Sequence, residues 1–256
     1  MVNKYRNIKK ILKSLCILVT LFSVSTLVSS ASLSSFKPSF KSIENTVVRK
    51  EVFFNYLLPK ILQKNAEIIE LRELILNNKL STIELNKLAL RYRVDSPASK
   101  EDLLMVIDIL PPSLILAQAA NESNWGRSRF AENFNNYFGI WCFSEGCGVI
   151  PKNRDENANH EVASFISLED CIDYYVLNIN RSYAYEELRL IRKNQRDDLK
   201  PLSGILLAEG LGNYANPGNE YIDSIKSLIQ FNHCLLYTSD AADEGLGVDL
   251  GGRRII

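Results

Sequence analysis

The sequence predicts a mainly helical protein with one small β excursion, preceded by N-terminal helices packed on the rest. Apolar residues recur every three to four positions through most of residues 42–110, and again after residue 167, which is the period of amphipathic helices. Between these regions, residues 146–151 and 160–165 read as two short extended segments joined by a polar loop. We therefore expect packed helices with a small β-hairpin lobe.

Two segments, one at each end, are set apart from this fold. Residues 1–31 carry basic residues and no acid, followed by an apolar run from Leu15 to Val28 and small residues up to Ala31. This is the layout of a secretory signal peptide. An uncleaved inner-membrane anchor is the alternative, although about 14 apolar residues are short for a span of roughly 20. Residues 234–256 lose the helical period and resemble a translated sequencing adapter, so we interpret them as an artefact and expect disorder.

The rest of the chain, residues 32–233, is long enough for one or two hydrophobic cores. Residues 32–41 are Ser-rich and read as a linker. The remaining 23 basic and 26 acidic residues give a net charge near −3. We therefore expect no nucleic-acid partner. We expect an exported monomer in the periplasm or cell envelope, with no stable membrane span in the mature chain.

Local signals set the helix boundaries in the N-terminal helical region, residues 42–110. The first part of its apolar pattern fits either one long helix or two helices broken at Pro59. The stretch Ser81–Glu84 has the form of a capping box and predicts the start of a new helix. Ser99 can cap a further helix that runs to about Leu110.

The next region, residues 111–233, begins with the stretch around which we expect the fold to be organised. A Pro-Pro-Ser helix start at 111–113 leads into an alanine-rich apolar run that stops at Glu122. An apolar setting can raise a glutamate pKa from about 4.3 toward roughly 6, which suits a general acid near neutral pH. The alternative is an ordinary surface acid at a helix end. We interpret Glu122 as the acid of a glycosidase.

Aromatic and amide residues follow Glu122 in two clusters, which suits a polar, ring-shaped substrate. Flat aromatic faces pack against sugar rings, and amides hydrogen-bond to hydroxyl and acetamido groups. The candidate substrate contacts are Asn124, Trp125, Asn135, Asn136, Tyr137 and Trp141. A place in the hydrophobic core is the alternative for Trp125 and for Phe138.

The cysteines suggest an oxidising compartment rather than a metal site. Cys142 and Cys147 lie five residues apart across a Gly-containing turn and could form a disulfide. Zinc would need two further ligands, and His160 is the only histidine besides His233. We therefore expect no metal and no cofactor. Cys171 lies in a helical pattern, and we expect it to be a buried free thiol.

The stretch AQAANESNWGRSRFAENFNNYFGIWCF resembles the signature of family 73 of the glycoside hydrolases, bacterial N-acetylglucosaminidases, and most closely its Bax-like branch. The family pattern is a Gln-Ala-(Ala)-x-Glu-Ser-x-Trp-Gly run followed by Asn-Asn-x-Phe-Gly. Ten positions match it in order: Gln118, Ala119, Glu122, Ser123, Trp125, Gly126, Asn135, Asn136, Phe138 and Gly139. The segments HEVASF and AEGLGNYANPGNEYIDSI also look Bax-like, so the similarity covers roughly residues 45–233.

This resemblance implies a lysozyme-like fold with Glu122 as general acid. It also implicates a tyrosine in a late NYA-type motif, which falls on Tyr214, although the sequence reads YANPGNEY where the family commonly has YATDPxY. Some members use a second glutamate on the β lobe, for which Glu145, Glu156 and Glu161 are candidates. Glu161 could equally be a plain surface residue of a strand. A second carboxylate is unnecessary if the 2-acetamido group of the substrate acts as nucleophile.

Three functions remain open at this point. The first, which we favour, is an endo-β-N-acetylglucosaminidase that cuts the peptidoglycan glycan strand on the reducing side of N-acetylglucosamine. The second is a muramidase or lytic transglycosylase acting on the same strand. The third is a non-catalytic glycan-binding protein. The region 32–233 contains no G-x-S-x-G elbow and no Walker or Rossmann loop, which excludes the corresponding hydrolase and nucleotide-binding classes.

Overall fold

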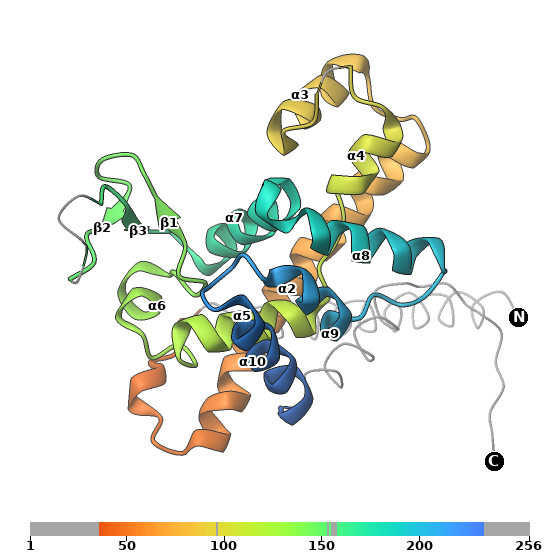
Figure 1. Ribbon diagram of the computed structural model, residues 1–256. Helices are drawn as coiled ribbons and strands as arrows, with labels where there is room; N and C mark the ends of the chain where they lie inside the picture. Colours follow the sequence, from red (N-terminus) through yellow and green to blue (C-terminus); the bar gives the residue numbers. More distant parts are fainter. Residues whose placement is uncertain (1–35, 96, 153, 155–157, 233–256) are drawn as a thin grey trace, which may run out of the picture. The chain divides into compact units, whose positions relative to one another are not determined.

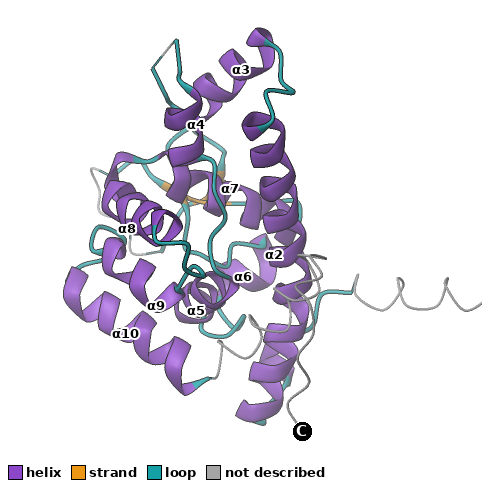
Figure 2. Cartoon of the chain, turned by 90° about the vertical axis from the view of Figure 1, so that its right-hand side faces the viewer, coloured by secondary structure: helices purple, strands orange, loops and turns teal. Residues whose placement is uncertain are grey.

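Helix α5 (Pro112–Ser123) lies at the centre of the computed structural model. All eight residues from Ser113 to Ala120 are buried, and a helix that is apolar on every side is stable only in an interior. Helix α5 packs against α2 (Thr46–Leu76) on one side and against α9 (Gly204–Leu207) and α10 (Gly218–Phe231) on the other (Figure 2). The rest of the fold therefore surrounds the helix that ends at Glu122.

The structure describes residues 36–232, with gaps at 96, 153 and 155–157. The predicted signal peptide and the adapter-like tail fall outside the described residues. From Ser39 onward, the described residues form one compact unit.

Helix α2 resolves one alternative that the sequence left open. It is continuous through Pro59, so the single long helix is confirmed. Its start is fixed by Asn45, whose side chain accepts hydrogen bonds from two backbone amides of the first turn. Its buried side carries Phe53, Leu57 and Ile61, and it packs against α5 and α7 (Leu168–Arg181).

Two capping boxes predicted from the sequence are present. Ser81 caps α3 (Thr82–Tyr92), and Ser99 caps α4 (Lys100–Val106), which ends four residues before the expected Leu110. Figure 1 shows α3 and α4 near the C-terminal end of α2. Helix α4 packs against α2, α3 and α8.

The remaining helices also follow the predicted order. Ser167 caps α7 through a third capping box, which starts that helix where the sequence predicts. Beyond it, two helical segments, residues 183–197 and 204–211, each divide into a 3₁₀ turn and an α-helix. The further elements are η1 (Phe40–Ser42), α6 (Arg129–Phe134), η2 (Tyr183–Tyr185), α8 (Glu186–Asp197) and η3 (Ala208–Leu211).

The β lobe is a three-stranded antiparallel sheet in the order β1-β3-β2. Strands β2 (Gly148–Val149) and β3 (Glu161–Ala163) form the predicted hairpin. Strand β1 (Trp141–Cys142) was not predicted, because it directly follows the Asn135–Gly139 motif and no extended apolar pattern surrounds it. In Figure 1 the sheet lies beside α6 and α7.

The predicted fold class is confirmed: mainly helical, with a small β lobe and N-terminal helices packed on the rest, the layout expected of a lysozyme-like domain. Among the residues that the structure describes, no helix combines the length and apolar character that crossing a membrane requires.

Candidate active site

Glu122 occupies the last turn of α5, where the central helix reaches the surface. Its side chain is half-buried, and desolvation by burial raises the pKa of its carboxyl, although hydrogen bonds from Tyr221 and Asn121 act in the opposite direction. The partial negative charge at a helix C-terminus further disfavours a carboxylate there. Within the described part of the chain, Glu122 forms no ion pair. The site therefore raises the pKa of the Glu122 carboxyl above that of an ordinary glutamate.

The first motif shapes the turn that ends α5. Three successive residues, Asn124, Trp125 and Gly126, have positive φ angles of 50°, 59° and 76°. The buried Ser123 hydroxyl accepts a hydrogen bond of 2.8 Å from the Gly126 amide. A Cβ at Gly126 would lie 2.3 Å from the Phe40 ring, so only glycine fits. These motif residues fix where the helix stops behind Glu122.

The second motif places a backbone turn against the acid. The buried Asn136 amide donates to the carbonyls of Ile140 and Ala163, both at 2.9 Å, and accepts hydrogen bonds from two backbone amides of its own turn. This turn brings Gly139, at φ +63°, so close that a Cβ there would lie 3.4 Å from Oε2 of Glu122. The second motif thus forms one wall beside the carboxyl.

Tyr214, the predicted second catalytic residue, lies in the same cluster as Glu122. Its hydroxyl donates to the Phe138 carbonyl at 2.8 Å, and its ring stacks on Tyr221 with centroids 5.2 Å apart. Burial, with further contributions from neighbouring tyrosines and Glu122, raises the pKa of Tyr214 well above its usual value. Tyr214 is therefore a neutral phenol at the site, held by the second motif.

Three further tyrosines around Glu122 were missed by the sequence reasoning. Tyr221 from α10 hydrogen-bonds to Glu122, while Tyr175 from α7 and Tyr185 from η2 lie close enough for their pKa values to respond to its charge. Burial and the Glu122 charge raise the pKa of Tyr185 to about 12. The available signal was a set of tyrosines on the apolar sides of predicted helices, which sequence alone does not distinguish from core.

Two predicted sugar contacts are wrong, because their side chains lie in the interior. Tyr137 is 0% exposed and packs against the rings of Phe40, Phe53 and Tyr56. Asn136 is 1% exposed, and its amide holds the backbone turn described above. Neither can touch a glycan in this conformation. Phe138 is also a core residue, as the alternative reading held.

Two other candidates are largely occupied by protein contacts. Trp125 is half-buried against Phe53 and Phe54 of α2, with the Lys50 ammonium 4.6 Å from its ring centroid. Asn135 caps α6 in a left-handed conformation, and its amide donates to two backbone carbonyls after β3. Both side chains serve the fold in this structure.

Trp141 and Asn124 remain accessible. Trp141 on β1 is 54% exposed and stacks on His160, with ring centroids 4.0 Å apart. Asn124 is exposed at the turn directly after Glu122. These two side chains are the predicted contacts that a bound glycan could reach.

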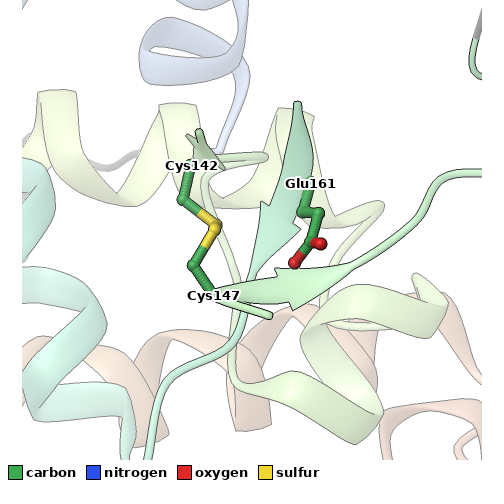
Figure 3. A group of neighbouring side chains, drawn as sticks. All are labelled: Cys142, Cys147 and Glu161. Atoms are coloured by element: carbon green, nitrogen blue, oxygen red, sulfur yellow. A yellow bond between two sulfur atoms is a disulfide. The ribbon is translucent and has the colours of Figure 1, made fainter. Parts of the chain in front are cut away.

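The β lobe is held by the predicted disulfide and by a carboxylate (Figure 3). Cys142 and Cys147 are bonded, and Glu161 accepts hydrogen bonds from the amides of Gly146 and Gly148 at 3.1 and 2.8 Å. These groups lie within 4.8 Å of one another, but the disulfide leaves no thiolate to bind a metal.

The other cysteine and glutamate predictions have separate outcomes. Cys171 is a buried thiol outside the disulfide, as expected. Glu145 is exposed in the β-lobe turn, and Glu156 lies outside the described residues. Because Glu161 is buried and occupied with the backbone, its most direct role is to hold the lobe together.

The chain is similar to known proteins in sequence and in structure. Residues 102–233 match a family described as mannosyl-glycoprotein endo-beta-N-acetylglucosaminidase. The chain is 28% identical over 218 residues to Protein bax of Escherichia coli (strain K12), covering 79% of this chain and 77% of that protein. The crystal structure of the catalytic domain of the autolysin Auto from Listeria monocytogenes aligns with a TM-score of 0.45 and 19% identity, covering 77% of this chain and 92% of that domain.

The family match covers more than half of the chain, and it contains α5, the β lobe and the tyrosine cluster. The protein therefore belongs to the glucosaminidase family of glycoside hydrolases.

Proposed function

We propose that this protein is a peptidoglycan endo-β-N-acetylglucosaminidase in which Glu122 is the general acid. One observation carries the proposal: a half-buried carboxyl with a raised pKa, which forms no ion pair with any described residue, lies at the surface end of the central helix. Glycoside hydrolysis requires a proton for the leaving oxygen, and Glu122 is the group suited to supply it. Family membership and the similarity to Protein bax support the substrate class.

The neighbours of Glu122 suggest how positive charge on the sugar is stabilised. Glu161 is occupied with two backbone amides, and Glu145 lies exposed on the lobe. We therefore favour nucleophilic participation by the 2-acetamido group of the substrate, one of the exceptions to the two-carboxylate scheme. Tyr214 lies in the acid's cluster and would help to position that group. Trp141 and Asn124 would contact the glycan beside the cleavage point.

The protein would act outside the cytoplasm, where its substrate is. The Cys142–Cys147 disulfide supports this placement, because disulfides persist in oxidising compartments. The basic and apolar composition of residues 1–31 supports export through a signal peptide.

Mass spectrometry of the fragments released from purified sacculi tests the proposal. Wild-type protein should release muropeptides with N-acetylglucosamine at the reducing end, and Glu122→Gln should release them about 10²–10⁴ times more slowly. Glu220→Gln, an exposed position in the first turn of α10, is the matched control and should behave as wild type.

Other outcomes would overturn the proposal. Reducing ends of N-acetylmuramic acid, or of its anhydro form, would indicate a muramidase or a lytic transglycosylase. Equal binding of sacculi by wild type and Glu122→Gln, with no release by either, would indicate a glycan-binding protein.

A further inference from the structure

A chain of hydrogen bonds connects the interior of the protein to Glu122. The Tyr175 hydroxyl donates to Oε1 of Gln118, and Nε2 of Gln118 donates to the Tyr221 hydroxyl at 2.9 Å. The Tyr221 hydroxyl also lies close to the Glu122 carboxyl, and a hydrogen bond between them contributes to the pKa shifts of both groups. Gln118 and Glu122 are four residues apart on α5, so they lie on one face of the helix, and Tyr221 from α10 bridges them.

The order of donors along this chain fixes the direction of one proton. A tyrosine hydroxyl has a single proton, and its oxygen already accepts a hydrogen bond from the Gln118 amide nitrogen. The proton of Tyr221 is therefore available to Glu122. The amide is held in this orientation because its oxygen accepts from Tyr175. All three side chains are buried, with Gln118 at 0% exposed.

A hydrogen bond donated by the Tyr221 hydroxyl determines which oxygen of the protonated Glu122 carboxyl carries the proton. A neutral carboxyl group has one O–H and one oxygen that can only accept. Asn121 donates to Oε1 of Glu122 at 3.2 Å, so with Tyr221 as a second donor to that oxygen the acid proton sits on Oε2. Without Gln118, the Tyr221 hydroxyl could turn and accept that proton in a hydrogen bond, which would direct the proton into the protein and away from a glycan.

We propose that Gln118 is a positioning residue that keeps Tyr221 as a donor and thereby keeps the acid proton of Glu122 directed at the substrate. This inference rests on the proposed function, because it assigns a role within general-acid catalysis. Gln118 touches neither the glycan nor the reacting atoms. It acts through Tyr221, and Tyr175 acts through Gln118.

Among the described residues, four tyrosines have pKa values that respond to the Glu122 charge. Tyr175, Tyr185, Tyr214 and Tyr221 come from α7, η2, the segment after η3, and α10. Burial, the first cause in each case, raises their pKa values above the usual range, so all four stay neutral through the working range of the acid. Changes in the alkaline limb of the pH–rate profile therefore report on Glu122.

A double-mutant cycle between Gln118→Met and Tyr221→Phe tests the proposal. Gln118→Met preserves volume and removes both hydrogen bonds. It should lower kcat roughly tenfold, a part of the 10²–10⁴ that acid catalysis contributes, with KM unchanged. The alkaline limb should move to higher pH, because the protonated Glu122 gains a hydrogen bond to Tyr221. In the Tyr221→Phe background, Gln118→Met should change neither kcat nor the pH profile.

Gln230→Met is the matched control, because it makes the same chemical change at an exposed position of α10. It should leave rate and pH profile unchanged. Equal losses from Gln118→Met in both backgrounds would overturn the proposal, since they would show a packing role independent of Tyr221. So would a wild-type pH profile in Gln118→Met, which would indicate the opposite orientation of the amide.

A second variant covers the case in which Gln118→Met does not fold, as circular dichroism would show. Tyr175→Phe removes only the donor that orients the amide. It should shift the pH profile in the same direction, and only when Tyr221 is present; a shift of equal size with Tyr221→Phe would contradict the proposal.

The proposed function and this inference can fail separately. If the wild type cleaves no glycan, the proposed function is wrong. The double-mutant cycle can then be measured without activity, as the pKa of the Glu122 carboxyl in each variant, by ¹³C NMR titration. The inference predicts that Gln118→Met raises the pKa of Glu122 when Tyr221 is present and not when it is phenylalanine. The same shift in both backgrounds would overturn it.

Discussion

Two carboxyl groups lie near opposite ends of helix α5, and their surroundings shift their pKa values in opposite directions. Asp108 lies before the helix begins and is 3% exposed, whereas Glu122 lies in its last turn. Both lose solvation, which raises the pKa of a carboxyl. Asp108 has arginines around it and is held ionised, while Glu122 has tyrosines and favours its proton.

The Asp108 site is a compact ion cluster. Arg196 binds both oxygens of the carboxylate at 2.9 and 3.1 Å, Arg72 lies 3.4 Å away, and Arg192 lies 3.8 Å away. Burial alone would raise the pKa of Asp108, but the Arg196 hydrogen bond and the charges of Arg192 and Arg72 hold it below its usual value. The arginines come from α2 and α8, so the cluster joins three parts of the fold.

The comparison shows that burial alone does not determine the role of an acid. A carboxylate surrounded by cations stabilises the folded state, and one surrounded by neutral phenols is available for chemistry. A carboxyl held ionised by arginines thus precedes helix α5, and a carboxyl with a raised pKa lies in its last turn. Substitutions at the two ends should accordingly affect different properties.

The largest expected effect is on turnover at the Glu122 end. Glu122→Gln should reduce the rate of glycan cleavage by about 10²–10⁴, because only proton donation is lost. Binding to sacculi should persist. Rates of muropeptide release and a pull-down with insoluble sacculi measure the two properties. A variant that retained more than about a tenth of the wild-type rate would show that another group supplies the proton.

At the Asp108 end, the expected effect is on stability. Asp108→Asn should lower the free energy of unfolding by about 3–5 kcal/mol, because it leaves the buried Arg192 and the half-buried Arg72 without a counter-charge. Denaturant unfolding measures this loss. Asp198→Asn is the control, because it removes an exposed ion pair with Lys200 that contributes about 0–1 kcal/mol. Equal losses in both variants would mean that the cluster adds nothing beyond a surface pair.

A smaller effect is expected at the wall beside Glu122. Gly139→Ala should cost about 1–2 kcal/mol in stability through strain at positive φ, and it should also lower kcat by crowding the acid. Gly146→Ala is the matched control, because Gly146 has φ +76° but no atom within 4 Å of an added Cβ. It should show the stability loss alone. If both variants lose kcat equally, crowding at Glu122 is not the cause.

The smallest effect is a pH-dependent gain in stability from Glu122→Gln. The folded protein keeps the Glu122 proton to higher pH than the unfolded chain does. Its free energy of unfolding therefore falls as pH rises from the ordinary pKa to the raised one. Above this window the variant should be more stable than wild type by about 0.5–2 kcal/mol, and below it the gain should vanish. Thermal unfolding across pH measures it; a gain that persisted unchanged at acidic pH would have another origin.

Much of the fold could be predicted because its signals are local. Ser81, Ser99 and Ser167 each start a helix through a contact with a residue three positions on, and such spacing is visible in sequence. The continuous apolar stretch of α5 likewise identified a buried helix that ends at Glu122. The passage of α2 through Pro59 could not be decided, because tertiary packing against α5 and α7 overrides the local penalty.

The site was only partly predictable, because its contacts are distant in sequence. Glu122 follows from its own segment, but Tyr221 and Tyr175 reach it from helices far along the chain. Asn136 and Tyr137 were misassigned as sugar contacts because an amide beside aromatics has the same composition in a binding groove and in a buried turn. The two cases differ in how deeply the side chains are buried, and burial cannot be predicted from a short sequence motif.

The most direct test of the contrast between the two ends of α5 is a ¹³C NMR titration of the side-chain carboxyls, assigned with Glu122→Gln and Asp108→Asn. We expect the pKa of Glu122 to lie above that of an ordinary glutamate, and the pKa of Asp108 to lie below that of an ordinary aspartate. A Glu122 carboxyl that titrated at or below its ordinary value would contradict the assignment of this residue as the acid.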